Sequence, residues 1–175
     1  MTIQSSPDLS FTNVDTQTMV NFIVSVGIQV RKAQLPEGLP IPGISVENGV
    51  LLVDEDNLLY PGDLLYQAGR IAILPENERN LYMGKDDPDK EKEATEGMVA
   101  MCWSWAALTH LQLSPEIVFH NNGYKGQSQQ IIHGYQSGAN MGLPMLQLYD
   151  MAYEPHQAIA RGLNPFPFMY KWTNK

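Results

Sequence analysis

The spacing of apolar residues predicts a helix near the start of the chain. Residues 1–13 are polar and aperiodic, and they are predicted to form a loose, flexible tail. Apolar side chains then recur at the spacing of one helical face, at Met19, Val20, Phe22, Ile23, Val26 and Val30. Asp15 is the expected N-cap, and Arg31 and Lys32 suit the negative C-terminal end of the helix dipole. The stripe indicates core packing.

The pattern changes after this helix and indicates a small sheet. Prolines at three positions within residues 35–43 remove backbone donors and predict an extended connection. Over residues 44–53 β-branched side chains become frequent, and Asn48-Gly49 is a hairpin turn signal. A second turn over residues 54–57 precedes the apolar residues 58–60. These features predict two or three antiparallel strands.

The remainder of the chain is predicted to be mainly helical. Pro61 suits a first helical position, and it opens a short amphipathic helix that ends before Pro75. A long helix over residues 91–111 is apolar around much of its circumference, which is typical of a central buried helix. Shorter helices are expected after Ser114, over residues 129–136 and over residues 143–151, followed by irregular structure over residues 156–175.

These elements predict one α+β domain over residues 14–175. A small antiparallel sheet is expected to pack on a helical core that contains the short amphipathic helix and the long central helix. The stretch 84–92 is charged and contains a proline, so it is predicted to be an exposed and mobile loop. Its acidic residues form either a solvated run or a loose Ca²⁺ site.

Composition and charge narrow the possible partners. The chain has 11 Lys and Arg against 19 Asp and Glu, for a formal charge of −8, and it shows no cluster of cations for phosphate, which argues against nucleic acid. No window reaches the ~18 apolar residues of a membrane span, and no secretory leader is evident, so no membrane association is expected. Cys102 is the one cysteine. A cytoplasmic location is predicted, because a reducing compartment suits such a chain.

The short helix carries the main functional clue. The segment 60–72 reads YPGDLLYQAGRIA, and it resembles the active-site helix of zinc metallopeptidases, which holds His-Glu-x-x-His. Tyr66, Gln67 and Arg70 stand at the positions of the two histidines and the glutamate. The chain more closely resembles a family of bacterial zincin-like proteins in which Pro-Gly-Asp-Leu-Leu precedes the intact motif.

The resemblance to zincin-like proteins extends over residues 45–150. It includes the segments Trp103-Ser104-Trp105-Ala106-Ala107, Val118-Phe119-His120 and Gly123-Tyr124-Lys125-Gly126. It implies a third metal ligand on the long helix, at Glu96 or, as the second choice, at Glu93. The alternative is an ordinary amphipathic helix in which Tyr66 and Arg70 form an incidental exposed pair.

The departures from the motif argue against zinc catalysis. The phenol of Tyr66 has an ordinary pKa near ~10 and is a poor zinc ligand at neutral pH. Arg70 places a permanent cation at a coordinating position, and Gln67 cannot accept a proton from water. We therefore expect no metal, no cofactor and no catalytic residue at this helix. Arg70 is predicted to replace the metal by an ion pair with Glu96, with Glu93 as the alternative partner.

Two further groups of residues are candidates for chemistry. Cys102 with one of the histidines would make a nucleophile and base, but a cysteine in an apolar helix is usually a buried small hydrophobe. A second group, in the loop before the helix at 129–136, would present backbone N–H groups and a lysine to an anion: Gly123, Lys125, Gly126 and Ser128. The alternative for this loop is a glycine turn with Ser128 as a helix cap.

The sequence therefore suggests a degenerate metallopeptidase-like protein, a pseudoenzyme. It is expected to bind a small ligand or a protein partner in the former active-site cleft, formed by Tyr66, Gln67, Arg70, Glu96 and His120. Two alternatives stay open. One is a hydrolase-like enzyme that uses Tyr66 and Glu96 as acid and base, and the other is a structural subunit that shares packing alone with the metallopeptidases.

Overall fold

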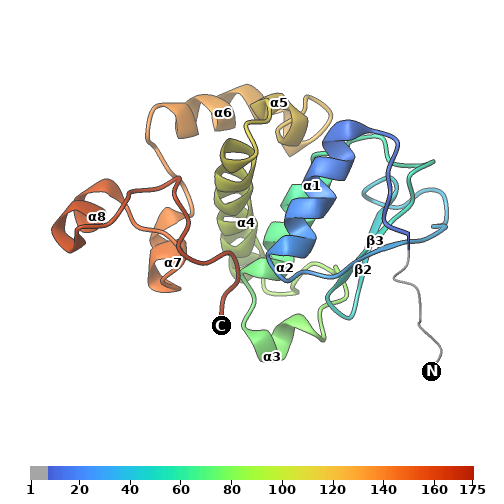
Figure 1. The fold of residues 1–175 in the computed structure, drawn as a ribbon, viewed down its shortest axis with the longest axis horizontal. Helices are drawn as coiled ribbons and strands as arrows, with labels where there is room; N and C mark the ends of the chain where they lie inside the picture. The colour runs from blue at the N-terminus through green and yellow to red at the C-terminus, as the bar shows by residue number, and fades with distance from the viewer. Residues whose placement is uncertain (1–7) are drawn as a thin grey trace.

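The computed structural model describes residues 8–175 and shows a mixed α+β protein (Figure 1). Its strands are β1 (Val30–Lys32), β2 (Ile44–Glu47) and β3 (Val50–Val53). Its helices are α1 (Val14–Ser25), α2 (Asp63–Ala72), α3 (Glu76–Arg79), α4 (Lys90–His110), α5 (Pro115–Val118), α6 (Ser128–Gln136), α7 (Leu143–Leu148) and α8 (Pro155–Arg161), with a short turn η1 (Tyr124–Gly126) before α6. Helix α4 stands at the centre, with α1, α2 and the sheet on one side and α7 and α8 on the other (Figure 1).

The sheet is mixed, and the expectation of an antiparallel sheet is therefore wrong in part. Strands β2 and β3 form the predicted antiparallel hairpin around Asn48-Gly49, with Ile44 opposite Val53. The third strand is β1, which pairs with β3 in parallel, so the order is β1-β3-β2. Residues 58–60, expected to extend the sheet, form no strand.

The parallel strand β1 takes residues that were predicted to end the first helix. Helix α1 stops at Ser25 because Gly27 has a left-handed backbone (φ +94°) and the Ile28 N–H bonds back to the Ile23 carbonyl, which is a helix-ending motif. Ile28 and Val30 are buried while Gln29 is exposed. This alternation is the strand signal that the helical interpretation of the segment missed.

Helix α1 also begins earlier than predicted. Asn13, not Asp15, is its N-cap, and the Asn13 side chain accepts from the Thr16 N–H at 2.9 Å. Of the predicted tail, residues 1–7 lie outside the described residues, but Phe11 is buried in the core. The packed part of the chain therefore starts before residue 14.

The long helix and the short amphipathic helix form the centre of the core. Helix α4 agrees with the predicted 91–111 to within a residue at each end, and Trp103 on it is fully buried. Helices α2 and α4 approach closely at Gly69, where an added Cβ would lie 3.0 Å from the Ala100 carbonyl oxygen. This close approach brings the polar side chains of α2 within reach of the first turns of α4.

The C-terminal segment contains more structure than predicted. Helix α8 has Pro155 at its start and Gly162 in a left-handed conformation at its end (φ +66°), which are ordinary start and stop signals. Trp172 then packs on Phe22 and Trp103 with ring centroids at 4.8 and 5.4 Å. The last residues therefore close the core over α1 and α4, as expected for an aromatic-rich segment. None of the helices within residues 8–175 is long and apolar enough to cross a membrane.

Candidate functional site

Arg70 lies where α2 crosses α4, and two carboxylates of α4 face it. Its Nη1 and Nη2 donate to Oε1 and Oε2 of Glu93 at 2.5 and 2.9 Å, and Nη2 lies 3.7 Å from Oε2 of Glu96. The Arg70 side chain is 6% exposed, so this is a nearly buried ion pair. The predicted pair across the two helices is confirmed, although Glu93 takes both hydrogen bonds and Glu96 the longer contact.

The ion pair sets the protonation of its members. Hydrogen bonds from Arg70 lower the pKa of Glu93 below its ordinary value. Burial alone would lower the pKa of Arg70, but Glu93 and the phenols of Tyr82 and Tyr66 together raise it. Burial raises the pKa of Glu96, whose two nearest cations, Arg70 and Lys92, each stay at 3.7 Å. That distance is too long for a hydrogen bond, so Glu96 is the least satisfied carboxylate of the group.

The loop before α4 is tied to the same ion pair. The Asp87 N–H donates to Oε2 of Glu93 at 2.8 Å, and Lys92 reaches Oδ2 of Asp87 at 2.8 Å. The predicted exposure of residues 84–92 is confirmed for every residue except the half-buried Asp87, and the last three residues belong to α4. The predicted mobility of this loop stays a prediction.

A second polar group lies at the start of α2. The His120 Nε2 lies 2.9 Å from Oδ1 of Asp63, and the imidazole stacks on Tyr60 with centroids 4.1 Å apart and planes 10° apart. A Cβ at Gly123 would lie 3.1 Å from His120 Cε1, so glycine leaves room for the imidazole ring. Burial raises the pKa of Asp63, even though His120 acts in the opposite direction. Within residues 8–175 the buried Nδ1 of His120 has no hydrogen-bond partner.

The loop predicted to bind an anion supports this second group. Ser128 is buried, and its hydroxyl donates to the His120 carbonyl at 2.7 Å, so it neither caps α6 nor faces outward. Lys125 is exposed, and Tyr124 and Lys125 both have left-handed backbones (φ +56° and +53°). Such strained backbone in residues other than glycine persists where surrounding contacts hold it. Tyr124 supplies those contacts, packing edge-on against the rings of His120 and Tyr66.

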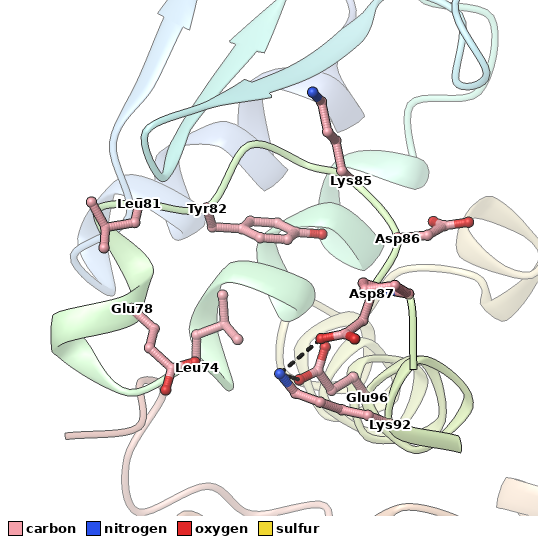
Figure 2. Close-up of a pocket in the computed structure, with 10 residues that line it drawn as sticks. Leu74, Glu78, Leu81, Tyr82, Lys85, Asp86, Asp87, Lys92 and Glu96 are labelled. Carbon is pink, nitrogen blue, oxygen red and sulfur yellow. Dashed lines mark ion pairs between the residues drawn. The ribbon is translucent and has the colours of Figure 1, made fainter. Parts of the chain in front are cut away.

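The Arg70 group borders a cavity of about 330 Å³. Figure 2 shows Tyr82 pointing into the middle of this pocket, with Leu74, Glu78 and Leu81 on one side and Asp87, Lys92 and Glu96 on the other. We call it the α3–α4 pocket, and its lining is Leu74, Glu78, Leu81, Tyr82, Lys85, Asp86, Asp87, Pro88, Lys92 and Glu96. It has four carboxylates and two ammonium groups around an apolar base.

Two of these carboxylates have no counter-ion. Asp87 and Glu96 share Lys92, whereas neither Glu78 nor Asp86 comes within ion-pair distance of a cation in the described part of the chain. Lys85 points away from the middle of the pocket (Figure 2). The pocket therefore presents an excess of negative charge next to apolar surface.

The predicted cleft residues do not share one pocket. Glu96 lines the α3–α4 pocket, Gln67 faces a small cavity along β2, and His120 faces a third cavity between α1 and α5. Tyr66 links the groups, because it stands near Arg70 and packs on Tyr124. Sequence reasoning missed Asp63 and Tyr82, and it placed Asp87 only in the acidic run of the loop. Asp63 had a signal, since it lies one and two helical turns before Tyr66 and Arg70.

The structure also gives the surroundings of the remaining candidates for catalysis and metal binding. Cys102 is buried, as predicted, and burial raises the pKa of its thiol. Among residues 8–175, no three His, Cys, Asp or Glu side chains gather in an arrangement that holds a metal ion. His120 is engaged with Asp63, so it is not positioned as a base for Cys102.

Fold and site define a mixed α+β protein in which two crossing helices enclose a buried arginine–carboxylate cluster beside an acidic pocket. Comparison of the chain with protein-family models, with curated proteins and with solved structures found no match. The functional argument therefore rests on the geometry of these residues.

Proposed function

We propose that this protein is a metallopeptidase-like binding protein that has exchanged zinc chemistry for ligand binding in the α3–α4 pocket. The observation that carries the proposal is the Arg70 cluster. A guanidinium stands at a would-be ligand position and is held by two carboxylates of the next long helix. In a metal site those carboxylates would face a cation of charge two, and Arg70 supplies one positive charge in its place. The pocket beside it keeps an acidic excess.

The chemistry of the pocket favours a cationic ligand with an apolar part. Glu78 and Asp86 offer carboxylates with no cation within ion-pair distance among residues 8–175, and the two cations of Glu96 stay at 3.7 Å. Leu74 and Tyr82 offer apolar contact. An ammonium group next to a short hydrocarbon or aromatic body satisfies both features. The ligand class is therefore an organic amine or a basic side chain of a peptide.

Titration with phenethylamine tests the proposal, with 2-phenylethanol as a neutral probe of the same shape. We expect saturable binding of the amine, detected by NMR shifts at Tyr82 and Glu96, and no such binding of the alcohol. Changing Glu78→Gln with Asp86→Asn removes two unpaired charges and is expected to weaken binding about threefold to tenfold. The matched control removes two exposed carboxylates elsewhere, by Glu37→Gln with Glu47→Gln, and should leave binding unchanged. Equal binding of amine and alcohol would overturn the proposal.

Restoring the metal ligands tests the proposed descent. A zinc site needs three protein ligands, and Tyr66→His with Arg70→His would add two nitrogens facing the carboxylates of α4. Combined with Gln67→Glu, this triple variant is expected to take up one zinc per chain by elemental analysis. The control keeps Arg70 and carries Tyr66→His and Gln67→Glu, and it should bind none. A folded triple variant without zinc would count against the descent, as would stoichiometric zinc in the unchanged protein.

A further inference from the structure

The C-terminal segment differs from the rest of the chain in charge. Residues 155–175 contain Arg161, Lys171 and Lys175 and no Asp or Glu, which gives a formal charge of +3. The preceding residues hold the other 8 Lys and Arg and all 19 Asp and Glu, for −11, and the two parts together give the −8 of the chain. A basic segment is thus attached to an acidic body.

An aromatic and cationic patch lies on this segment and on Tyr153, just before it. Arg161 Cζ lies 4.9 Å over the ring of Tyr153, Tyr153 lies 5.7 Å from Tyr170, and Tyr170 lies 4.8 Å from Phe168. Tyr153 is buried and forms the base, with its hydroxyl on Asp150, whereas Phe168 is 48% and Tyr170 39% exposed. We call these four residues, Tyr153, Arg161, Phe168 and Tyr170, the arm patch. Arginine and aromatic residues are the side chains most enriched at the centres of protein interfaces.

Arg161 of the arm patch stands on helix α8, at the periphery of the molecule. Helix α8 lies at the outer end of the structure, beyond α7 (Figure 1). Ala158 on α8 is buried, while the neighbouring Ile159 is 75% exposed. The helix thus packs inward through a small side chain and exposes one large apolar side chain to solvent.

We infer that the arm patch of one molecule docks into the α3–α4 pocket of a second copy of this chain. The patch has a guanidinium beside exposed aromatic rings, and the pocket has unpaired carboxylates, Glu78 and Asp86, beside exposed Leu81. Charge and apolarity therefore match on both sides. The inference rests on the proposed function, because it names the occupant of the same pocket.

The apolar base of the pocket favours a second copy over other acidic surfaces, because net charge repels the acidic body in every case. Nucleic acid and anionic membranes would attract the basic segment but repel the body of formal charge −11. A second copy presents its negative charge together with a shaped apolar pocket. The contact joins two different surfaces, so it is heterologous, and it builds a closed ring or an open chain of molecules according to its rotation.

Analytical ultracentrifugation of the full chain, from about 10 µM to about 1 mM, measures the association. We expect concentration-dependent self-association that weakens at about 1 M salt, where the screening length falls to about 3 Å. Reversing Arg161 of the arm patch and Lys171, which follows Tyr170 in the basic segment, by Arg161→Glu with Lys171→Glu should weaken association about tenfold or more. Reversing the pocket charges by Glu78→Lys with Asp86→Lys should have an effect of the same size. The control reverses two exposed cations elsewhere, by Arg31→Glu with Lys125→Glu, and should associate like the unchanged protein.

Mixing the two charge-reversed proteins gives the decisive result. The acidic arm of one then faces the basic pocket of the other, so the mixture should associate although each protein alone does not. A protein that stays monomeric at all concentrations would overturn the inference. A monomer that binds anionic vesicles through the arm patch would overturn it too. Association that is insensitive to both reversals would overturn it as well.

Titration with phenethylamine distinguishes a failure of the self-association inference from a failure of the proposed function. The arm-reversed variant keeps its pocket, so it should still bind phenethylamine, and more readily than the associated protein. A monomeric protein that binds the amine would leave the proposed function intact and remove the inference alone. A protein that neither associates nor binds the amine would remove both.

Discussion

Two polar groups on α2 differ in how fully their charges and hydrogen bonds are satisfied. At the Arg70 end, a buried guanidinium meets two carboxylates, and Glu93 also holds a loop N–H. At the Asp63 end, one nitrogen of His120 is paired and the other is buried without a partner in the described chain. One helix therefore carries a compensated polar cluster and an uncompensated one. The Arg70 cluster connects two helices through satisfied hydrogen bonds. The Asp63–His120 group leaves a buried nitrogen without a hydrogen bond, which costs free energy of folding.

The backbone is regular around the Arg70 cluster and strained around His120. Arg70 and its partners stand on regular helices, α2 and α4. His120 is enclosed by a loop in which Tyr124 and Lys125 adopt left-handed backbones. Each such residue costs on the order of 1 kcal/mol, which the aromatic contacts of the loop must offset. Strain and an orphaned nitrogen thus coincide at one end of the helix.

Removing Arg70 should have the largest effect. Arg70→Ala leaves Glu93 and Glu96 facing each other in a largely buried site, so we expect a loss of about 3–5 kcal/mol in the free energy of unfolding. Adding Glu93→Gln removes the stranded charge, and the double variant should be more stable than the single one. Urea denaturation measures both, with Arg31→Ala at an exposed position as the control. A single variant that loses less than about 1 kcal/mol would mean that the pair is an ordinary surface contact.

The stability of the protein should be sensitive to an added methyl group next to His120. Gly123→Ala places a methyl group 3.1 Å from an imidazole that is already stacked on Tyr60, so we expect a loss of about 1–3 kcal/mol in the free energy of unfolding. Gly134→Ala is the matched control. Gly134 lies on helix α6, and its added Cβ would lie 3.8 Å from the nearest atom, the Ala139 carbonyl oxygen. That change should stabilise the protein by about 0.5–1 kcal/mol. Effects of the same sign in urea denaturation would contradict the tight enclosure of the ring.

The two groups also differ in how far the sequence predicts them. Helical spacing and capping residues predict α2 and α4, and charge compensation predicts that Arg70 faces carboxylates of α4. The choice of Glu93 over Glu96 depends on the crossing of the helices at Gly69, which no local pattern reveals. The pairing of His120 with Asp63 joins positions 57 residues apart, and β1 depends on a parallel partner that a sequence pattern cannot assign.

Glu93 of the Arg70 group and Asp63 of the other group should respond to pH with opposite sign. The pKa of Glu93 is lowered, so its stabilising contribution is present above the ordinary value and is lost as pH falls below about 4.5. The pKa of Asp63 is raised, so its contribution is full below about 3.8 and is lost as pH rises through the higher folded value. Glu96 has a raised pKa too and acts in the same sense as Asp63.

Urea denaturation across pH separates these contributions. Between pH 7 and about 4.5, Asp63→Asn should reduce the gain in stability on acidification, by on the order of 1 kcal/mol or less. Below about pH 4.5, Glu93→Gln should reduce the loss. The control is Glu37→Gln, which changes an exposed carboxylate. If both variants shifted the profile in the same window and direction, the contrast between the two groups would fail.

The smallest change in stability is expected at the rim of the Arg70 cluster. Lys92 reaches Asp87 at 2.8 Å and Glu96 at 3.7 Å, but its side chain is 51% exposed and screened by water. Lys92→Ala should therefore change the free energy of unfolding by about 0.5 kcal/mol or less. Its effect on the pocket should be larger, since the change releases two carboxylates that a ligand ammonium can then contact.

We expect Lys92→Ala to bind phenethylamine several times more tightly than the unchanged protein, by loss of an internal competitor for Asp87 and Glu96. Lys85→Ala removes the other cation of the pocket, but Lys85 points away from its middle (Figure 2), so its effect on amine binding should be smaller. Calorimetric titration of both variants gives the comparison. Weaker binding by Lys92→Ala would mean that Lys92 arranges the carboxylates for the ligand, and that the cluster and the pocket act as one unit.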